Sequence, residues 1–206
     1  MFKESLHKDK RVKDHIIQSF RNYSSILRNR TFMQLTAVLT LLSASLFAYI
    51  SALSFIYQQH YGYNSLWYEI FFAINASGFT LGAHLSGRTS SLLALKIGIW
   101  GSVFTCLILL ATVLYSGNFW LVEILFFSFG LFYGLVMPSG SAVAIKLERK
   151  FPGSASAMIG FCPFFLCSVA SPLTGIDDPF KTTAIIMMIC SFAALFIFRF
   201  INIQKI

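Results

Sequence analysis

The chain has 206 residues, of which 56% are hydrophobic and 12% are charged, about half the charged share of an average soluble protein. Its formal net charge is +8, but no stacking motif interleaves with the basic residues, which argues against nucleic-acid binding. The first 30 residues hold no continuous apolar stretch, so they are not expected to form a signal peptide. The composition indicates an integral membrane protein.

A basic segment at residues 1–31 comes first, and we expect a cytoplasmic loop or an amphipathic helix on the membrane surface. Six apolar runs follow. A helix needs about 20 residues to cross the roughly 30 Å hydrocarbon core, and each run is long enough. The sequence therefore predicts an all-α, polytopic six-helix transmembrane bundle over residues 32–206. The runs are Thr36–Tyr57, Leu66–Leu85, Leu92–Tyr115, Phe119–Ile145, Ser154–Thr174 and Thr182–Phe200.

The basic residues are distributed very unevenly between the two sides of this predicted membrane protein. When the six runs alternate across the bilayer, 15 of the 16 Lys and Arg residues fall on one side, and only Lys181 is left on the other, beside Asp177 and Asp178. The positive-inside rule then places both termini in the cytoplasm, with the basic side facing anionic lipid. We expect a multi-pass protein of a bacterial inner membrane.

Polar residues within the apolar runs are informative, because lipid-facing helices need only apolar side chains. We expect most serines of the first run to bond back to carbonyls of their own helix. Tyr49 lies at mid-membrane depth, where a phenol needs a partner, so it either packs within the bundle or lines a cavity together with one or two of these serines. Asn75, in the middle of the second run, either bonds to an adjacent helix or faces an aqueous substrate cavity.

Glycines predict where helices approach each other closely. Gly78 and Gly82 share a stripe of the second run with Asn75, and a separate stripe of that run is also rich in small residues. Two such faces predict a central helix with two close neighbours. Gly130 and Gly134 form a GxxxG pattern in the fourth run, which permits close backbone approach.

The fifth run also has a smooth, small-residue face, which includes Gly153 and Gly160, and it is interrupted by Pro163 and Pro172. This pattern predicts a helix that can slide or rock against a partner. The third and sixth runs are more uniformly apolar, and we expect them to be peripheral, lipid-facing supports.

The sequence lacks the residue patterns of an active site. Glu69 and Glu123 lie near the outer ends of their runs, where we expect their carboxylates to reach water. For Glu69, a role in coupling or in recognising a cation is the alternative. The four cysteines lie within the runs, at spacings that do not suit a metal, and are interpreted as small packing residues. We therefore predict no catalytic residues, no metal, no cofactor and no enzymatic activity.

Several strings resemble a known family. Phe47-Ala-Tyr-Ile-Ser-Ala-Leu-Ser-Phe-Ile56, followed by Gln58 or Gln59 and Tyr61-Gly62, resembles the seventh span of the bicyclomycin-resistance (Bcr/CflA) drug-efflux subfamily of the major facilitator superfamily. Leu53-Ser54 replaces the family's Ser-Pro, so the sequence no longer specifies the family's kink there. Three further strings are similar to the subfamily's eighth span, tenth span and start of the eleventh, in that order: Phe72-Ala-Ile-Asn75-Ala, Pro138-Ser-Gly-Ser-Ala142 and Pro152-Gly-Ser-Ala-Ser-Ala157.

The segment from Gly82 to Gly87-Arg88 is similar to a reduced form of the superfamily's cytoplasmic loop motif. The resemblance covers about residues 23–200 and implies the C-terminal six spans of a twelve-span, proton-coupled multidrug antiporter, with antibiotic resistance as its expected effect. It also implies that a separate N-terminal half is the partner and carries the proton-coupling acid, and that the substrate is a hydrophobic or cationic small molecule. The residues expected to line the substrate site are Phe47, Tyr49, Ser51, Phe71 and Asn75.

A different class of function is also compatible with the sequence. The missing proline and the reduced loop motif favour a non-transporting membrane protein, either an accessory subunit or the remnant of a disrupted transporter gene. A homodimer that acts as its own second half is a third alternative, but it would couple protons through two copies of an interior that we predict to be poor in acids.

Overall fold

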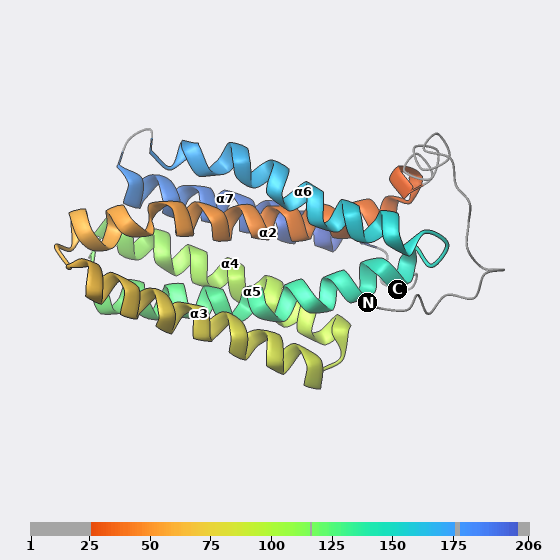
Figure 1. The fold of residues 1–206 in the computed structure, drawn as a ribbon, viewed down its shortest axis with the longest axis horizontal. Coiled ribbons are helices and arrows are strands. Elements are labelled where there is room, and N and C mark those ends of the chain that lie inside the picture. The colour runs from red at the N-terminus through yellow and green to blue at the C-terminus, as the bar shows by residue number, and fades with distance from the viewer. Residues whose placement is uncertain (1–25, 116, 176–177, 202–206) are drawn as a thin grey trace, which may run out of the picture.

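The computed structural model describes residues 26–115, 117–175 and 178–201. Within them, six long helices run alternately up and down (Figure 1), which confirms the predicted all-α fold. Residues 1–25 of the predicted basic segment lie outside the described part. The helices are α2 (Arg30–Ser54), continued by the π-helix η2 (Phe55–His60), α3 (Ser65–Arg88), α4 (Ser91–Tyr115), α5 (Phe119–Leu147), α6 (Pro152–Leu173) and α7 (Pro179–Arg199).

Asn and Asp caps help to set where several helices begin. Asn29 accepts a hydrogen bond from the N–H of Phe32 at 3.2 Å, so α2 starts six residues before its apolar run. Asn64, Asn118 and Asp178 accept from backbone N–H groups in the same way at the starts of α3, α5 and α7. Such caps satisfy backbone donors that a helix start leaves without a partner.

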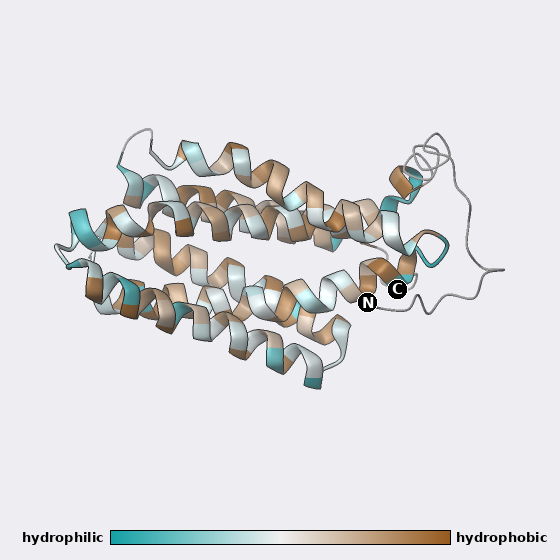
Figure 2. Cartoon of the chain, viewed as in Figure 1, coloured by the Kyte–Doolittle hydropathy of each residue, from teal (hydrophilic) through white to brown (hydrophobic). Residues whose placement is uncertain are grey.

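Hydrophilic residues collect at the two ends of the bundle, and apolar residues run along the helices (Figure 2). The joined segment Arg30–His60 and helices α4, α5, α6 and α7 are each long and apolar enough to cross a membrane. Helix α3 is long enough, but polar residues such as Asn75 and His84 leave it less apolar than the others. Helix α3 packs along α5, which is both long enough and apolar enough to span a membrane. This packing places α3 in the membrane beside α5.

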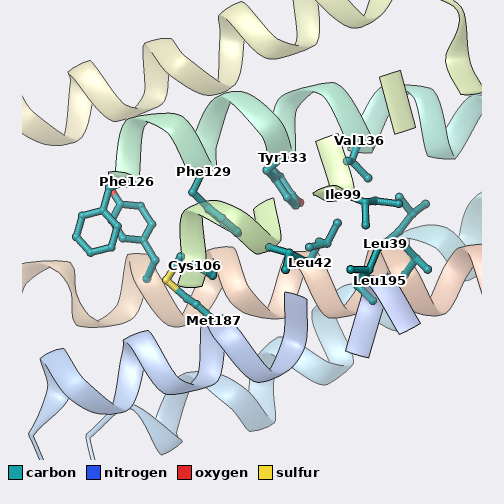
Figure 3. Packing of buried hydrophobic residues seen from close by; sticks show 14 of the residues in the cluster. Leu39, Leu42, Ile99, Cys106, Phe126, Phe129, Tyr133, Val136, Met187 and Leu195 are labelled. Carbon is teal, nitrogen blue, oxygen red and sulfur yellow. The ribbon is translucent and has the colours of Figure 1, made fainter. Parts of the chain in front are cut away.

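The hydrophobic core lies between α2, α4, α5 and α7. Helix α2 packs on α7 and α5, and α4 packs on the same two helices. Figure 3 shows side chains from all four helices meeting there, among them Leu42, Cys106, Phe129 and Met187. The prediction that the third and sixth spans are peripheral supports is therefore wrong within this chain. Their uniform apolarity arises because one face of each enters this core.

Helices α3 and α6 flank the core on opposite sides (Figure 1). Helix α3 packs extensively on α5 alone, and α6 packs mainly on α2. The prediction of a central second span with two close neighbours is therefore wrong: one small-residue stripe of α3 meets α5, and the other, which includes Ala76 and Thr80, is exposed.

The pairing of helices follows an internal symmetry. If α2, α3 and α4 are exchanged with α5, α6 and α7 in that order, the contact α3–α5 becomes α6–α2, and α4–α5 becomes α7–α2. The contacts α2–α5 and α4–α7 map onto themselves. Because α2 and α5 run in opposite directions, the two triplets form an inverted repeat, the arrangement that many transporter folds use.

Close contact between α3 and α5 depends on glycine at both helices. A Cβ added to Gly78 would lie 2.8 Å from the carbonyl oxygen of Phe127, and one added to Gly82 or Gly134 would overlap the facing backbone. Gly130 is less tight, with the carbonyl oxygen of Asn75 at 3.2 Å from such a Cβ. These glycines let the two backbones touch.

The two predicted packing glycines of α6 are placed differently. A Cβ added to Gly153 or Gly160 would meet no atom of the described residues within 4 Å. The buried residues of α6 include Ala155, Met158 and Ile159 but neither glycine. The prediction that Gly153 and Gly160 support a close helix contact is therefore not met within the described part of the chain. Pro163 and Pro172 both lie inside α6, which continues through them as one helix.

Candidate functional site

A cavity of about 140 Å³ lies between α2, α3 and α5. Its lining is mostly apolar, and four of the lining side chains on α2 and α3 are themselves exposed on the surface of the bundle. Binding sites for small molecules typically have such an apolar lining with a few polar groups. The lining residues are Leu46, Tyr49, Ile50, Phe72, Asn75, Ala76, Phe79, Phe126 and Gly130.

Two polar atoms in this lining lack a hydrogen-bond partner within the described residues, namely the hydroxyl of Tyr49 and the carbonyl oxygen Oδ1 of Asn75. Tyr49 is 4% exposed, and its ring packs on Phe126 with centroids 4.4 Å apart. A buried polar atom without a partner is costly. Both atoms belong to residues of the cavity lining but are themselves buried, and the Tyr49 hydroxyl lies near Tyr57 and Asn75.

The amide nitrogen of Asn75 points the other way, into a buried polar cluster. It donates to the hydroxyl of Tyr57 at 3.1 Å and to Oε1 of Glu123 at 3.0 Å. The Tyr57 hydroxyl donates in turn to Oε2 of Glu123. The first alternative for Asn75 is therefore confirmed, because its nitrogen bonds to η2 and α5. The residue also lies in the lining of the cavity, and its contact with a substrate stays a prediction.

The position of Tyr57 depends on an irregular helix. Directly after Ser54 the α-helix becomes the π-helix Phe55–His60, with one more residue in each hydrogen-bonded turn. This change re-aims the following side chains, and Tyr57 lies within it. The sequence has no proline at Leu53-Ser54, yet the helix departs from α geometry immediately afterwards.

Glu123 differs from its predicted placement. We expected its carboxylate to reach water from the outer end of the span, but the side chain is 6% exposed and bonded to Tyr57 and Asn75. The expectation of an interior poor in acids is wrong at this residue. The reason is a cover of aromatic side chains at this end of the bundle. Glu69, by contrast, is exposed as expected.

That aromatic cover contains Phe71, one of the predicted substrate residues. Its ring lies 4.9 Å from Phe119 and 5.7 Å from Tyr57, measured between centroids. Phe119 is one helical turn before Glu123 on α5 and also packs on Tyr63 and Tyr61. Phe71 therefore belongs to a cluster outside the cavity lining.

Phe47 and Ser51 lie at the contact between α2 and α6. Phe47 is partly buried against Phe164, with ring centroids 5.8 Å apart. Ser51 donates to the carbonyl oxygen of Phe47 at 2.8 Å and shares a hydrogen bond with Ser171. Ser43 and Ser45 likewise donate to carbonyls of their own helix, which confirms the expected role of these serines.

Gly87 and Arg88, the predicted loop motif, form the exposed end of α3. A Cβ at Gly87 would meet nothing within 4 Å, so no close contact in the described residues requires glycine there. Tyr57 was not singled out from the sequence at all. The signal that could have identified the cluster is the acidic Glu123 within an apolar run, since a carboxylate among hydrocarbon side chains requires partners.

The fold and cavity define a polytopic helical membrane protein built from two inverted three-helix repeats. The chain belongs to the Major Facilitator Superfamily, whose family profile matches residues 2–172. This is a superfamily of transporters rather than of enzymes. The chain is also 30% identical over 189 residues to an uncharacterized MFS-type transporter, YdgK of Bacillus subtilis (strain 168). That match covers 90% of this chain and 46% of the relative, so the chain spans about half of the relative's length.

Proposed function

We propose that this bundle forms one side of the substrate site of a proton-coupled multidrug exporter. The observation that carries the proposal is the cavity between α2, α3 and α5, whose mostly apolar lining includes two polar residues, Tyr49 and Asn75, each with a buried polar atom that lacks a partner among the described residues. Such a site can bind a mainly hydrophobic molecule and orient it through one or two hydrogen bonds.

The lining favours hydrophobic cations among such molecules. The rings of Tyr49, Phe72, Phe79 and Phe126 supply much of its surface. An organic cation over an aromatic face gains about 0.5–2 kcal/mol, more when water is excluded. Tyr49 and Asn75 are then the main contacts. Phe47 and Ser51 extend the site toward α6, and Phe71 closes its outer end.

A second six-helix bundle completes the site in this proposal. A cavity of about 140 Å³ is smaller than the roughly 300–1,000 Å³ of typical ligand sites. The exposed faces of α3 and α6, including Ala76, Gly153 and Gly160, offer small residues to a further partner. The relative YdgK is about twice as long as this chain, which leaves room for such a bundle. Rocking of the two bundles would expose the site to each side in turn.

The proposed orientation follows from the charged ends of the helices. Among the described residues, Arg30, Arg88, Lys146 and Arg199 lie at one end of the bundle, and Lys181 lies at the other. The positive-inside rule puts the first end in the cytoplasm. We propose the bacterial inner membrane as the location.

Efflux of ethidium, a fluorescent hydrophobic cation, tests the proposed function. Cells would produce this chain alone, or together with the second six-helix bundle proposed above, and the Asn75→Ala variant would be compared in the same cells. Export only with both chains, and reduced by Asn75→Ala, is the expected result. Export by this chain alone would show that two copies form the site. No export with both proteins present in the membrane would contradict transport and favour a non-transporting accessory protein or remnant.

A further inference from the structure

Glu123 lies behind the cavity rather than on its surface. The lining residues include Asn75 and Tyr49 but not Glu123. Asn75 is the link, because its amide nitrogen bonds to the carboxylate and the same residue belongs to the cavity lining. A substrate in the cavity would therefore touch Asn75 and not Glu123. A proton, however, is small enough to reach the carboxylate.

The surroundings of Glu123 contain no compensating cation within the described residues. Lys181 and Asp178 do form an ion pair, 3.4 Å apart, but it lies at the outer end of α7 and not beside Glu123. The titratable groups that face the carboxylate are phenols, Tyr57 from η2 and Tyr49 from α2, with Tyr68 of α3 next to Tyr57. The charge of a carboxylate buried in this way must be balanced by hydrogen bonds or removed by a proton.

The aromatic cluster limits access to Glu123 from the outer side. Phe119 lies one turn nearer the outer end on the same face of α5, and Tyr63 and Phe71 pack on it at 4.6 and 4.9 Å between centroids. Exchange of a proton with the outer side requires this cluster to open. On the side of the cavity, Tyr57 and Asn75 are the residues bonded to Glu123, so different residues cover the carboxylate on its two sides.

We propose that Glu123 is the group that binds and releases the transported proton, and that Asn75 transmits its charge state to the substrate cavity. The inference rests on the proposed function and names the residue that performs its coupling. It places this residue on the present bundle, where the family resemblance led us to expect none.

The hydrogen-bond changes balance without any further reactant. The ionised carboxylate accepts from Tyr57 and from Asn75, as the structure shows. When a proton binds to one carboxylate oxygen, the new O–H group donates to the Tyr57 oxygen, and the Tyr57 hydrogen turns toward the nearby Tyr49 oxygen, which has no other partner among the described residues. The Asn75 amide loses a charged acceptor and becomes free to bond in the cavity. Release of the proton reverses each step.

Transport by the complete protein in proteoliposomes tests the assignment. The membrane would contain this chain with its second bundle, and uptake of ethidium would be measured with an imposed pH gradient and, separately, as exchange without a gradient. Glu123→Gln keeps the shape of the side chain but cannot ionise. Glu69→Gln, an exposed acid near the same end of the bundle, is the matched control.

Glu123→Gln is expected to reduce gradient-driven uptake at least tenfold while exchange falls far less, and Glu69→Gln is expected to change neither. Equal loss of driven uptake and exchange would overturn the proposal, because it would indicate a direct contact with the cationic dye or a structural role. Undiminished driven uptake would also overturn it. If the unmodified protein shows no uptake in either assay, the proposed function itself fails.

A second measurement does not depend on transport. Addition of ethidium to the purified complex in weakly buffered detergent is expected to release protons, detected with a pH indicator dye, and Glu123→Gln is expected to abolish this release. Tyr57→Phe, which removes one donor to the carboxylate, should shift the pH at which release is half complete. Proton release by Glu123→Gln equal to that of the unmodified protein would assign the proton to another group.

Discussion

The contacts α3–α5 and α6–α2 are equivalent under the inverted repeat, yet they are built differently. At the first, glycines of both helices bring the backbones into contact, with Gly82 and Gly134 facing each other. At the second, α2 contains no glycine, and Ala44 packs on Cys167 and Ala170 instead. A Cβ added to either glycine of α6 would meet nothing within 4 Å among the described residues.

The difference shows that a small-residue stripe predicts a close contact without predicting the partner. In α3, the stripe with Gly78 and Gly82 is used inside the chain. In α6, the stripe with Gly153 and Gly160 meets nothing within 4 Å among the described residues. If the second stripe has a partner in the second bundle, the two stripes should respond oppositely to the same substitution.

Gly134→Leu has the largest expected effect. A side chain at this position would overlap the carbonyl oxygen of Phe79 and lie close to the backbone nitrogen of Ala83. Overpacking against rigid backbone should cost about 3 kcal/mol or more. We expect a strongly lowered melting temperature or aggregation in detergent. Normal folding of this variant would contradict our description of the α3–α5 contact.

Gly160→Leu makes the same substitution at a glycine that faces open space within the described part of the chain, and we expect the opposite pattern of effects. Nothing within 4 Å opposes a side chain there, so the melting temperature of this chain alone should change little. Co-purification with the second bundle, and ethidium export by the pair, should both fall severalfold because the added side chain would separate the two proteins. A stable pair with full export would show that this face of α6 contacts lipid.

Asn75→Ala should have an intermediate effect, because it removes the bonds to Tyr57 and Glu123 while creating little clash. Export of ethidium is expected to fall about tenfold, with the amount of protein in the membrane nearly unchanged, as judged by immunoblot. Ser77→Ala is the control on the same helix, since this exposed hydroxyl bonds only to the carbonyl oxygen of Ile74. Unchanged export would make Asn75 a packing residue.

The helices were predictable from the sequence because span length is set by membrane thickness and apolar runs are continuous. Asn and Asp caps explain the few residues by which the starts differ, as at Asn29 and Asp178. Which helices enter the core of the bundle was not predictable in the same way. Uniform apolarity fits both a lipid-facing helix and one with a face in the core, and α4 and α7 proved to have a face in the core.

The site was predicted in part for a similar reason. Tyr49 and Asn75 are conspicuous because a polar group at mid-membrane depth needs a partner. Glu123 lies five residues into α5, where a side chain would ordinarily reach water. Its burial depends on Tyr57, which is 66 positions away in the sequence. Tyr57 is placed by a π-helix that follows Ser54 without a proline at that position. Contacts of this kind depend on tertiary packing, which local pattern does not specify.

The serine pairs give the smallest and most sensitive comparison. Ser86 on α3 and Ser139 on α5 are both buried and share a hydrogen bond of 2.6 Å, whereas Ser51 and Ser171 are only partly buried. Hydrogen bonds between membrane helices contribute about 0.6 kcal/mol on average, and a partly buried pair can exchange its bond for water. Ser86→Ala should therefore lower the melting temperature in detergent by a degree or two, and Ser171→Ala by less. A larger effect of Ser171→Ala would mean that the α2–α6 contact is the tighter of the two, which would reverse the comparison drawn from the glycines.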